Sequence, residues 1–215
     1  METLTLTQEY VLCAIGERGG LDVEKQTCLV AAGVLELWLE NVITLEGKTF
    51  SVCGPLPERL SHLRSLYEEI EKKQPVKVEK LIEEYAYGIS GRKLQRLMED
   101  VGESLVRAGG AEKRSGGLLG KKTIYCPDPE RRDAAVQMIR AELLEEGPLS
   151  DDAAALAVLL EKSGALKRYF SAYERKRLNQ RLKELKDSPE HQVVTRMMEH
   201  LYVLFSLITV SVLSN

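Results

Sequence analysis

The chain has 215 residues, of which 44% are hydrophobic and 29% are charged, and its formal net charge is −3. This composition allows a substantial buried core, excludes a disordered chain and gives no overall attraction to nucleic acid. The cysteines lie far apart without a Cys-x-x-Cys pair, which argues against a zinc site and against a disulfide framework. An acid stands at Glu2, where a secretory signal carries bases, so we expect a cytoplasmic protein.

The first two predicted elements are helices. Thr5 and Gln8 have the spacing of a capping box, so the first helix should begin near Thr5 and end at Gly19–Gly20. Asp22 offers an N-cap to a second helix that reaches about Glu40. The apolar positions of this second helix recur every three or four residues, which predicts one buried stripe. The stripe consists of Val23, Thr27, Val30, Ala31, Val34, Leu35 and Trp38.

Two β-hairpins are predicted among the helices. β-Branched stretches on either side of Glu46–Gly47 predict the first hairpin over Val42–Val52, and the second is expected over Glu112–Cys126. Proline, glycine and capping residues set the limits of the other helices. One helix is expected to begin at Pro55 and Pro57 and to end at Pro75, and a shorter helix should follow it as far as Tyr87–Gly88. Further helices are expected from Ser90 to Arg107 and over residues 130–146, 151–162, 166–186 and 191–213.

The longest apolar run is Leu201–Leu213, which holds 13 residues without a charge. Crossing a bilayer takes about 20 residues, so the run favours a buried core helix over a membrane tail. No connection is long or biased enough to be a linker. We therefore expect a mainly α-helical fold, with a single compact multi-helix domain over residues 1–215, a buried C-terminal core helix and two small β-hairpins.

Residues that usually carry catalysis or metal binding are scattered. His62, His191 and His200 have no Cys or Glu at metal-ligand spacing, so a structural or surface role is favoured over ligation. No nucleophile, Walker or dinucleotide motif is present. The acid pair Asp151–Asp152 begins a predicted helix, where it favours the helix dipole rather than acid–base catalysis. We expect no enzyme activity, no metal and no cofactor.

Segment Ser163–Ser188 concentrates positive charge. It contains eight bases and three acids, a local charge of +5 in a chain that carries −3 overall. One interpretation is a solvated helix face. The other is a contact with an anionic surface, since acidic lipid attracts a basic helix by about 1 kcal/mol for each well-placed base. The eight bases are Lys167, Arg168, Arg175, Lys176, Arg177, Arg181, Lys183 and Lys186.

The tip of the second hairpin carries Leu118 and Leu119 among glycines, where a side chain cannot pack into a core. Bases flank them on both sides, as in a shallow membrane anchor whose apolar atoms enter the acyl boundary while the bases stay at the headgroups. The alternatives are an ordinary glycine-rich turn or a tip that packs on a neighbouring subunit. The flanking bases are Lys113, Arg114, Lys121 and Lys122.

Several segments, taken in order, resemble the Golgi phosphoprotein 3 family. They are LTLTQEYVLCAIGERGG, AAGVLELWLENVITLEGK, SLVRAGGAEKR with the two leucines after it, and ALAVLLEKSGALKRYFSAYERKRLNQRLKEL with the C-terminal apolar helix. The resemblance implies a mainly helical peripheral membrane protein that binds phosphatidylinositol 4-phosphate in a basic pocket and inserts a hydrophobic hairpin. In eukaryotes it implies the cytosolic face of the Golgi and the retention of glycosylation enzymes there. The short N-terminus without a basic tail suggests a prokaryotic-type member.

The resemblance implies a lipid pocket with one tryptophan and three arginines, and this sequence keeps none of the four. The corresponding positions hold Leu21, Val30, Gln95 and Met98. Candidates to replace the arginines lie within one turn of the last two positions, and they are Arg92, Lys93 and Arg96. We expect contacts with anionic lipid from these three residues, from the four hairpin bases and from two bases of the basic segment, Arg175 and Arg177.

Two other functions remain as alternatives. The first is a non-catalytic interaction protein that forms a homo-oligomer through residues 112–126. The second is a winged-helix unit that ends in the hairpin Val42–Val52 and would read DNA. Its recognition helix, residues 22–40, carries Lys25 against four acids, whereas a helix that enters a phosphate-lined groove should be basic. We therefore expect no nucleic acid partner.

Overall fold

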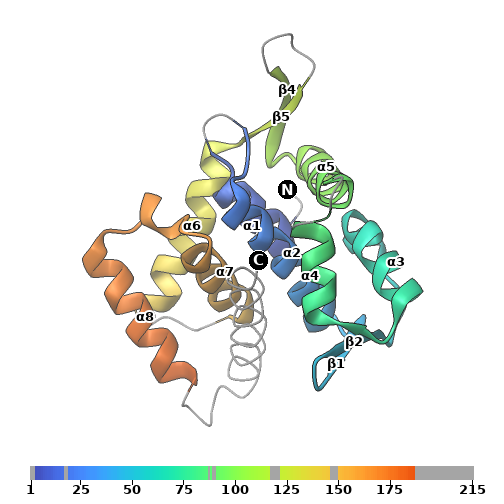
Figure 1. Cartoon of the computed structure of the whole chain (residues 1–215). Coiled ribbons are helices and arrows are strands. Elements are labelled where there is room, and N and C mark those ends of the chain that lie inside the picture. Colours follow the sequence, from blue (N-terminus) through green and yellow to red (C-terminus); the bar gives the residue numbers. More distant parts are fainter. Residues whose placement is uncertain are drawn as a thin grey trace.

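The computed structural model describes residues 3–16, 19–86, 88, 91–116, 122–145 and 150–186. Within these ranges the protein is mainly α-helical, with two small antiparallel sheets set among the helices (Figure 1), so the predicted fold class is confirmed. The expected helix over 191–213, with its apolar run 201–213, lies outside the described residues. The single domain over 1–215 stays a prediction, while one cluster of buried side chains extends from Leu6 to Leu182.

The helices and strands of the described ranges have the following limits. The α-helices are α1 (Leu6–Ala14), α2 (Val23–Leu39), α3 (Arg64–Lys73), α4 (Val78–Ala86), α5 (Arg92–Arg107), α6 (Pro129–Leu143), α7 (Asp151–Lys162) and α8 (Ala172–Lys186). Two 3-10 helices are η1 (Glu58–Leu63) and η2 (Leu166–Arg168). The strands are β1 (Ile43–Glu46), β2 (Thr49–Val52), β3 (Val76–Lys77), β4 (Ala111–Gly116) and β5 (Lys122–Pro127).

Helix α1 begins where the capping box predicts. The backbone N–H of Thr5 donates to Oε1 of Gln8 over 2.9 Å, which is one half of that box. The helix ends at Ala14 rather than at Gly19–Gly20, so the predicted C-terminal limit was wrong. Its last carbonyl groups accept hydrogen bonds from side chains much later in the chain, which a search for local glycine caps does not detect.

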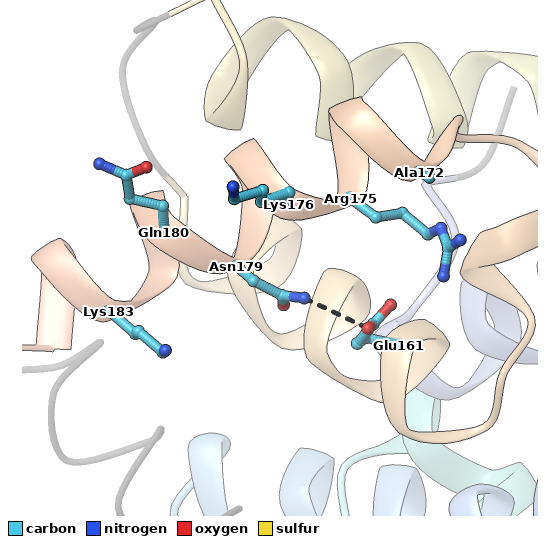
Figure 2. A pocket seen from close by; sticks show the side chains of 7 residues that line it. All are labelled: Glu161, Ala172, Arg175, Lys176, Asn179, Gln180 and Lys183. Carbon is cyan, nitrogen blue, oxygen red and sulfur yellow. Dashed lines mark hydrogen bonds between the residues drawn. The ribbon is translucent and has the colours of Figure 1, made fainter.

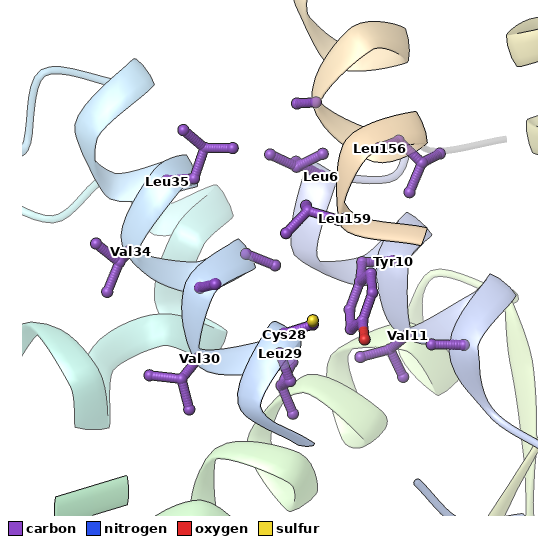
Figure 3. Packing of buried hydrophobic residues seen from close by; sticks show 14 of the residues in the cluster. Leu6, Tyr10, Val11, Cys28, Leu29, Val30, Val34, Leu35, Leu156 and Leu159 are labelled. Atoms are coloured by element: carbon purple, nitrogen blue, oxygen red, sulfur yellow. The ribbon is translucent and has the colours of Figure 1, made fainter. Parts of the chain in front are cut away.

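Helix α2 is the centre of the structure. Every residue from Thr27 to Leu37 is buried, because α1, α3, α4, α5 and α7 all pack against this helix. Figure 3 shows side chains of α2 facing those of α1 and α7. The predicted one-sided stripe was too narrow: burial extends around the whole helix, while Val23 at its start is 59% exposed. A helix that is apolar all round belongs in a core, and here that helix is α2.

The first predicted hairpin is confirmed as β1 and β2, which pair antiparallel around Gly47. Gly47 has a φ of 60°, a conformation that glycine adopts without steric cost. A third strand, β3, pairs with β2 through Phe50 and Val76 and was not predicted. Two residues are too few for a strand pattern, so only the tertiary pairing identifies β3.

The second hairpin consists of β4 and β5 and projects from the body beyond α5 (Figure 1). Its base is attached to α5, because the ring of Tyr125 packs on Gly102, where any added side chain would collide with it. The predicted pair of strands is confirmed. The tip, residues 117–121, lies outside the described part of the chain, and with it Leu118, Leu119 and Lys121.

Helices α6, α7 and α8 form the C-terminal part of the described structure. Helix α7 has its predicted limits, and the hydroxyl of Ser150 accepts the N–H of Ala153 over 3.2 Å as its N-cap. The predicted helix over 166–186 is instead divided into η2 and α8. The backbone N–H of Ser171 donates to the carboxylate of Glu174, and the backbone N–H of Glu174 donates to the hydroxyl of Ser171. This reciprocal pair is a capping box, so a new helix starts after Ser171.

Candidate functional site

The predicted cations at the start of α5 lie in a network of ion pairs. Lys93 lies between the carboxylates of Glu69 on α3 and Glu84 on α4, and Lys73 contacts the same two carboxylates. The four N–O distances are between 2.5 and 2.9 Å. Because the two lysines share two acids, the network is neutral. Lys93 therefore has little charge to offer to a lipid.

The pKa values of this network agree with strong pairing. Partial burial alone would raise the pKa of Glu69, but hydrogen bonds from Lys73 and Lys93 lower it to about 2. Of the other two predicted residues, Arg96 is 65% exposed and lies 3.9 Å from Asp100, and Arg92 also has an interaction partner. The structure thus brings the three predicted cations to one helix end, where each interacts with the protein itself.

The four positions that correspond to the family's pocket do not form a charged pocket. Val30 lies in the centre of α2 and is completely buried, and Leu21 is also buried. Gln95 is exposed on α5, and Met98 packs partly against the core. Apolar side chains therefore fill the space where the resemblance implies the tryptophan and the helix arginine.

The hairpin bases that the structure describes are also paired. Nζ of Lys113 lies 2.5 Å from the carboxylate of Glu103, and Arg114 lies 2.7 Å from Glu112. Lys122 is the first residue of β5. Both ion pairs are solvent-exposed and weak, so they can exchange for lipid phosphate more readily than the α5 network can.

One base of the segment 163–188 is used by the fold. The guanidinium of Arg168 donates to the carbonyl oxygens of Cys13, Ala14 and Ile15 over 2.7 to 2.9 Å. The hydroxyl of Tyr169 donates to Cys13 as well, over 2.8 Å. These side chains cap the C-terminus of α1, where carbonyl groups have no helical partner and attract a cation. Arg168 is therefore a structural residue.

The outer face of α8 carries bases that have no acidic partner among the described residues. Tyr173 is 70% exposed there, and Lys176 and Arg177 follow it at the three- and four-residue spacings that place side chains next to each other. Arg177 donates to the carbonyl of Leu144 over 3.2 Å, a bond that leaves its charge uncompensated. Within the described ranges, Lys176, Arg177 and Lys183 form no ion pair.

A cleft of about 500 Å³ lies between α8 and the end of α7 (Figure 2). Arg175, Lys176 and Lys183 line it from α8, and Glu161 lines it from α7. The side-chain amide of Asn179 donates to Glu161 over 3.2 Å. Of the predicted site residues, Arg175 lies in this cleft and Arg177 lies outside its lining.

The sequence prediction missed three residues of this surface. Tyr173, Lys176 and Lys183 were not selected as site residues, because the whole segment was considered without separating its faces. Their helical spacing was a usable signal: positions 176 and 183 are two turns apart, and the core residues Leu178 and Leu182 mark the opposite side.

Other reactive groups occupy structural positions. His62 is buried, with its Nε2 3.2 Å from Oγ1 of Thr5 and 3.6 Å from a carboxylate oxygen of Glu36. Burial raises the pKa of the Cys13 and Cys28 thiols to about 12, which keeps them protonated and unreactive. Among the residues that the structure describes, no group of His, Cys, Asp or Glu is arranged to hold a metal ion.

Comparison with known proteins identifies one family. The family model described as Golgi phosphoprotein 3 (GPP34) matches residues 6–201, which is most of the chain. No curated protein matches the sequence. In the described part of the chain, no helix is long and apolar enough to cross a membrane.

Proposed function

Because the chain belongs to the Golgi phosphoprotein 3 family, we propose that it is a non-catalytic peripheral membrane protein that binds anionic phospholipid. The observation that carries the proposal is the outer face of α8, where Tyr173 is exposed among cations that form no ion pair with any residue the structure describes. The protein then works in the cytoplasm at a membrane surface, which is the cytosolic face of the Golgi in a eukaryotic cell. Phosphatidylinositol 4-phosphate is the family's lipid, but this chain lacks the four pocket residues that the resemblance implies.

The composition of this face fits a membrane–water interface. Each lysine or arginine near an acidic surface contributes about 1 kcal/mol, so Lys176, Arg177 and Lys183 together support reversible attachment. Tyrosine is enriched at the headgroup level, where its ring is apolar and its hydroxyl is hydrated. An exposed aromatic side chain among bases that form no ion pair within the described ranges therefore suits a lipid headgroup layer better than bulk water.

The hairpin β4–β5 supplies a second contact in this proposal. It projects from the body, and the sequence places Leu118 and Leu119 at its tip, between bases on both strands. Insertion of two leucines adds about 0.8 kcal/mol for each buried methylene group. A charged face and an apolar tip are the two signals that stable membrane anchoring requires.

Vesicle co-sedimentation tests the proposed function. The full chain should pellet with vesicles of phosphatidylcholine and phosphatidylserine, should not pellet with phosphatidylcholine alone, and should be released as salt concentration rises. Equal binding to both vesicle types would remove the electrostatic part of the proposal. No binding to either type would overturn the proposal.

A second candidate function is assembly through the same hairpin, residues 112–126. The supporting observation is that β4 and β5 pair only with each other in the described structure, and that Glu112–Ser115 are exposed. A two-stranded hairpin is marginally stable alone and leaves backbone groups for a further strand on each edge. Replacing Leu118 and Leu119 with serine distinguishes the two roles: loss of vesicle binding supports insertion, and a shift to a smaller sedimentation coefficient supports assembly.

The DNA-binding alternative fits this structure poorly. The helix that a winged-helix unit would insert into the major groove is α2, and it is buried from Thr27 to Leu37. Exposing it would dismantle the core. We therefore do not propose nucleic acid as a partner.

A further inference from the structure

The base of the hairpin β4–β5 is held on both faces of one strand. We propose that Gly19 and Gly102 are positioning residues, which receive Ile124 and Tyr125 of β5 and so fix the direction in which the hairpin projects. Residues next to each other on a strand point to opposite faces, so the two contacts hold β5 from opposite sides. The role of this direction at a membrane rests on the proposed function, whereas the fixed direction itself does not.

The contact between Tyr125 and Gly102 joins β5 to α5. A Cβ atom at position 102 would overlap the ring of Tyr125, so only glycine allows the ring to lie this close to the helix. Tyr125 is buried, and its hydroxyl donates to the carboxylate of Glu103 over 3.2 Å. Nζ of Lys113, the residue opposite Tyr125 on β4, lies 2.5 Å from the same carboxylate. Both strands of the hairpin are therefore attached to the same part of α5.

The contact between Ile124 and Gly19 joins β5 to the connection between α1 and α2. A Cβ atom at position 19 would lie 2.6 Å from Cβ of Ile124, which is too close for any side chain. Gly19 has a φ of 71°, a conformation that glycine adopts without steric cost. Its N–H donates to the carbonyl of Gly16 over 2.8 Å, and the N–H of Gly16 donates to Gly20 over 3.1 Å. These bonds hold in place the backbone that Ile124 contacts.

A hairpin of two strands needs contacts of this kind to keep one direction. In the described structure β4 and β5 pair only with each other, and a two-stranded hairpin is marginally stable by itself. Figure 1 shows the hairpin projecting beyond α5, away from the other helices. A projection that swings freely must lose that freedom when it binds, and the loss weakens binding. The two contacts at the base of β5 restrict this motion before any partner arrives.

Distances between spin labels, measured by pulsed electron paramagnetic resonance in solution, test the fixed direction. Ser115→Cys on β4 and Glu68→Cys on α3 place the labels, because both residues are exposed. The parent chain carries Cys53→Ser and Cys126→Ser, and the other two cysteines are buried. We expect one narrow distance distribution in this parent. A broad distribution would overturn the proposal.

Glycine variants of the labelled chain test which residues fix the direction. Gly102→Ala and Gly19→Ala should each broaden or shift the distance distribution, because the added methyl group displaces the side chain of β5. Gly20→Ala is the matched control: nothing lies within 4 Å of a Cβ atom at this position, so the distribution should not change. An unchanged distribution in Gly102→Ala, or an equal change in Gly20→Ala, would contradict the positioning role.

Melting temperatures separate the contact at Gly102 from a general effect of the substitution. Alanine favours an α-helix more than glycine does, so Gly102→Ala should stabilise α5 wherever Tyr125 does not obstruct the methyl group. We therefore expect Gly102→Ala to lower the melting temperature of the wild type and to raise that of Tyr125→Ala. Such a reversal is specific to residues in direct contact. The same sign in both backgrounds would overturn the assignment of Gly102.

Vesicle binding tests whether the fixed direction serves the membrane contact. With vesicles of phosphatidylcholine and phosphatidylserine, Gly102→Ala should bind about three-fold more weakly than the wild type, and Gly20→Ala should bind as well as the wild type. Normal vesicle binding by a Gly102→Ala protein with a broadened distance distribution would overturn the role at the membrane. If the wild type binds no vesicles but keeps its narrow distribution and the reversal at Gly102, the proposed membrane function fails and the fixed hairpin stands.

Discussion

The start of α5 and the middle of α8 are both rich in lysine and arginine, but they differ in the acidic side chains that surround these bases. At α5, residues 92–96 hold three bases, and α3 and α4 place Glu69 and Glu84 against Lys93. At α8, residues 175–183 hold five bases, and Glu161 of α7 is the acid among the residues that line the cleft beside them. The number of bases in a segment therefore does not determine how much charge it presents to a partner.

Topology causes this difference. Helices α3 and α4 are joined around Pro75 and bring two acids from distant positions to the same point, where Lys73 and Lys93 meet them. Helix α8 packs on α6, and within the described residues its Lys176, Arg177 and Lys183 form no ion pair, whereas Arg181 lies 3.9 Å from Glu184. The acidic side chains that the fold brings next to a base therefore decide whether the charge of that base is neutralised.

The largest expected effect concerns a base that the fold uses. Replacing Arg168 with alanine leaves the three carbonyl groups at the end of α1 without their donor. Hydrogen bonds from a charged group are worth about 2 kcal/mol, so the free energy of unfolding should fall by about that amount in urea titrations. Vesicle binding should change little, because this charge already has acceptors. A stable Arg168→Ala protein with ten-fold weaker vesicle binding would show that Arg168 acts at the membrane.

The next effect compares two variants with the same change in charge. Lys176→Ala/Lys183→Ala and Lys73→Ala/Lys93→Ala each remove two positive charges. The first should weaken binding to phosphatidylserine vesicles roughly ten-fold and leave thermal stability unchanged. The second should lower stability and change vesicle binding less than three-fold, since its lysines are neutralised by acids. Equal losses of vesicle binding would mean that only net charge matters.

Local signals in the sequence predicted much of the fold. Thr5 with Gln8, Asp22 and Ser150 start their helices as expected, since capping depends on residues within one turn. Ser171 with Glu174 is the same kind of signal and was overlooked. The end of α1 was not predictable in this way, because its cap comes from Arg168, more than a hundred residues later.

The candidate site was only partly predictable for a similar reason. The segment 163–188 was identified correctly as basic, but its charges divide among a structural cap, an ion pair, a cleft and an open face. Helical periodicity assigns Lys176 and Lys183 to one side, whereas the pairing of Lys93 with Glu69 requires the tertiary fold. Spacing gives the faces of a helix, and it does not give the acids of other helices.

The ion-pair network between α3, α4 and α5 makes the stability of the fold depend on pH. Hydrogen bonds from Lys73 and Lys93 outweigh the effect of burial and lower the pKa of Glu69 from its ordinary value of 4.5 to about 2. These bonds therefore stabilise the folded protein fully at a pH above 4.5. This contribution is lost as pH falls from about 5 to about 2, and it amounts to roughly 1 kcal/mol after solvent screening. Urea unfolding should show a smaller loss of stability over this range in Lys73→Ala/Lys93→Ala than in the wild type. The same pH profile for both proteins would contradict a network held by these lysines.

The smallest expected effect isolates the apolar part of α8. Tyr173 is 70% exposed and gains from the interface through its ring, which salt does not screen. Tyr173→Ser should weaken vesicle binding about three-fold, and the loss should be the same at low and high salt, unlike that of Lys176→Ala/Lys183→Ala. Tyr173→Phe keeps the ring and should bind as well as the wild type, which separates ring insertion from any role of the hydroxyl. If Tyr173→Ser binds normally at both salt concentrations, α8 contacts lipid through charge alone, and any apolar insertion then belongs to the hairpin tip at Leu118 and Leu119.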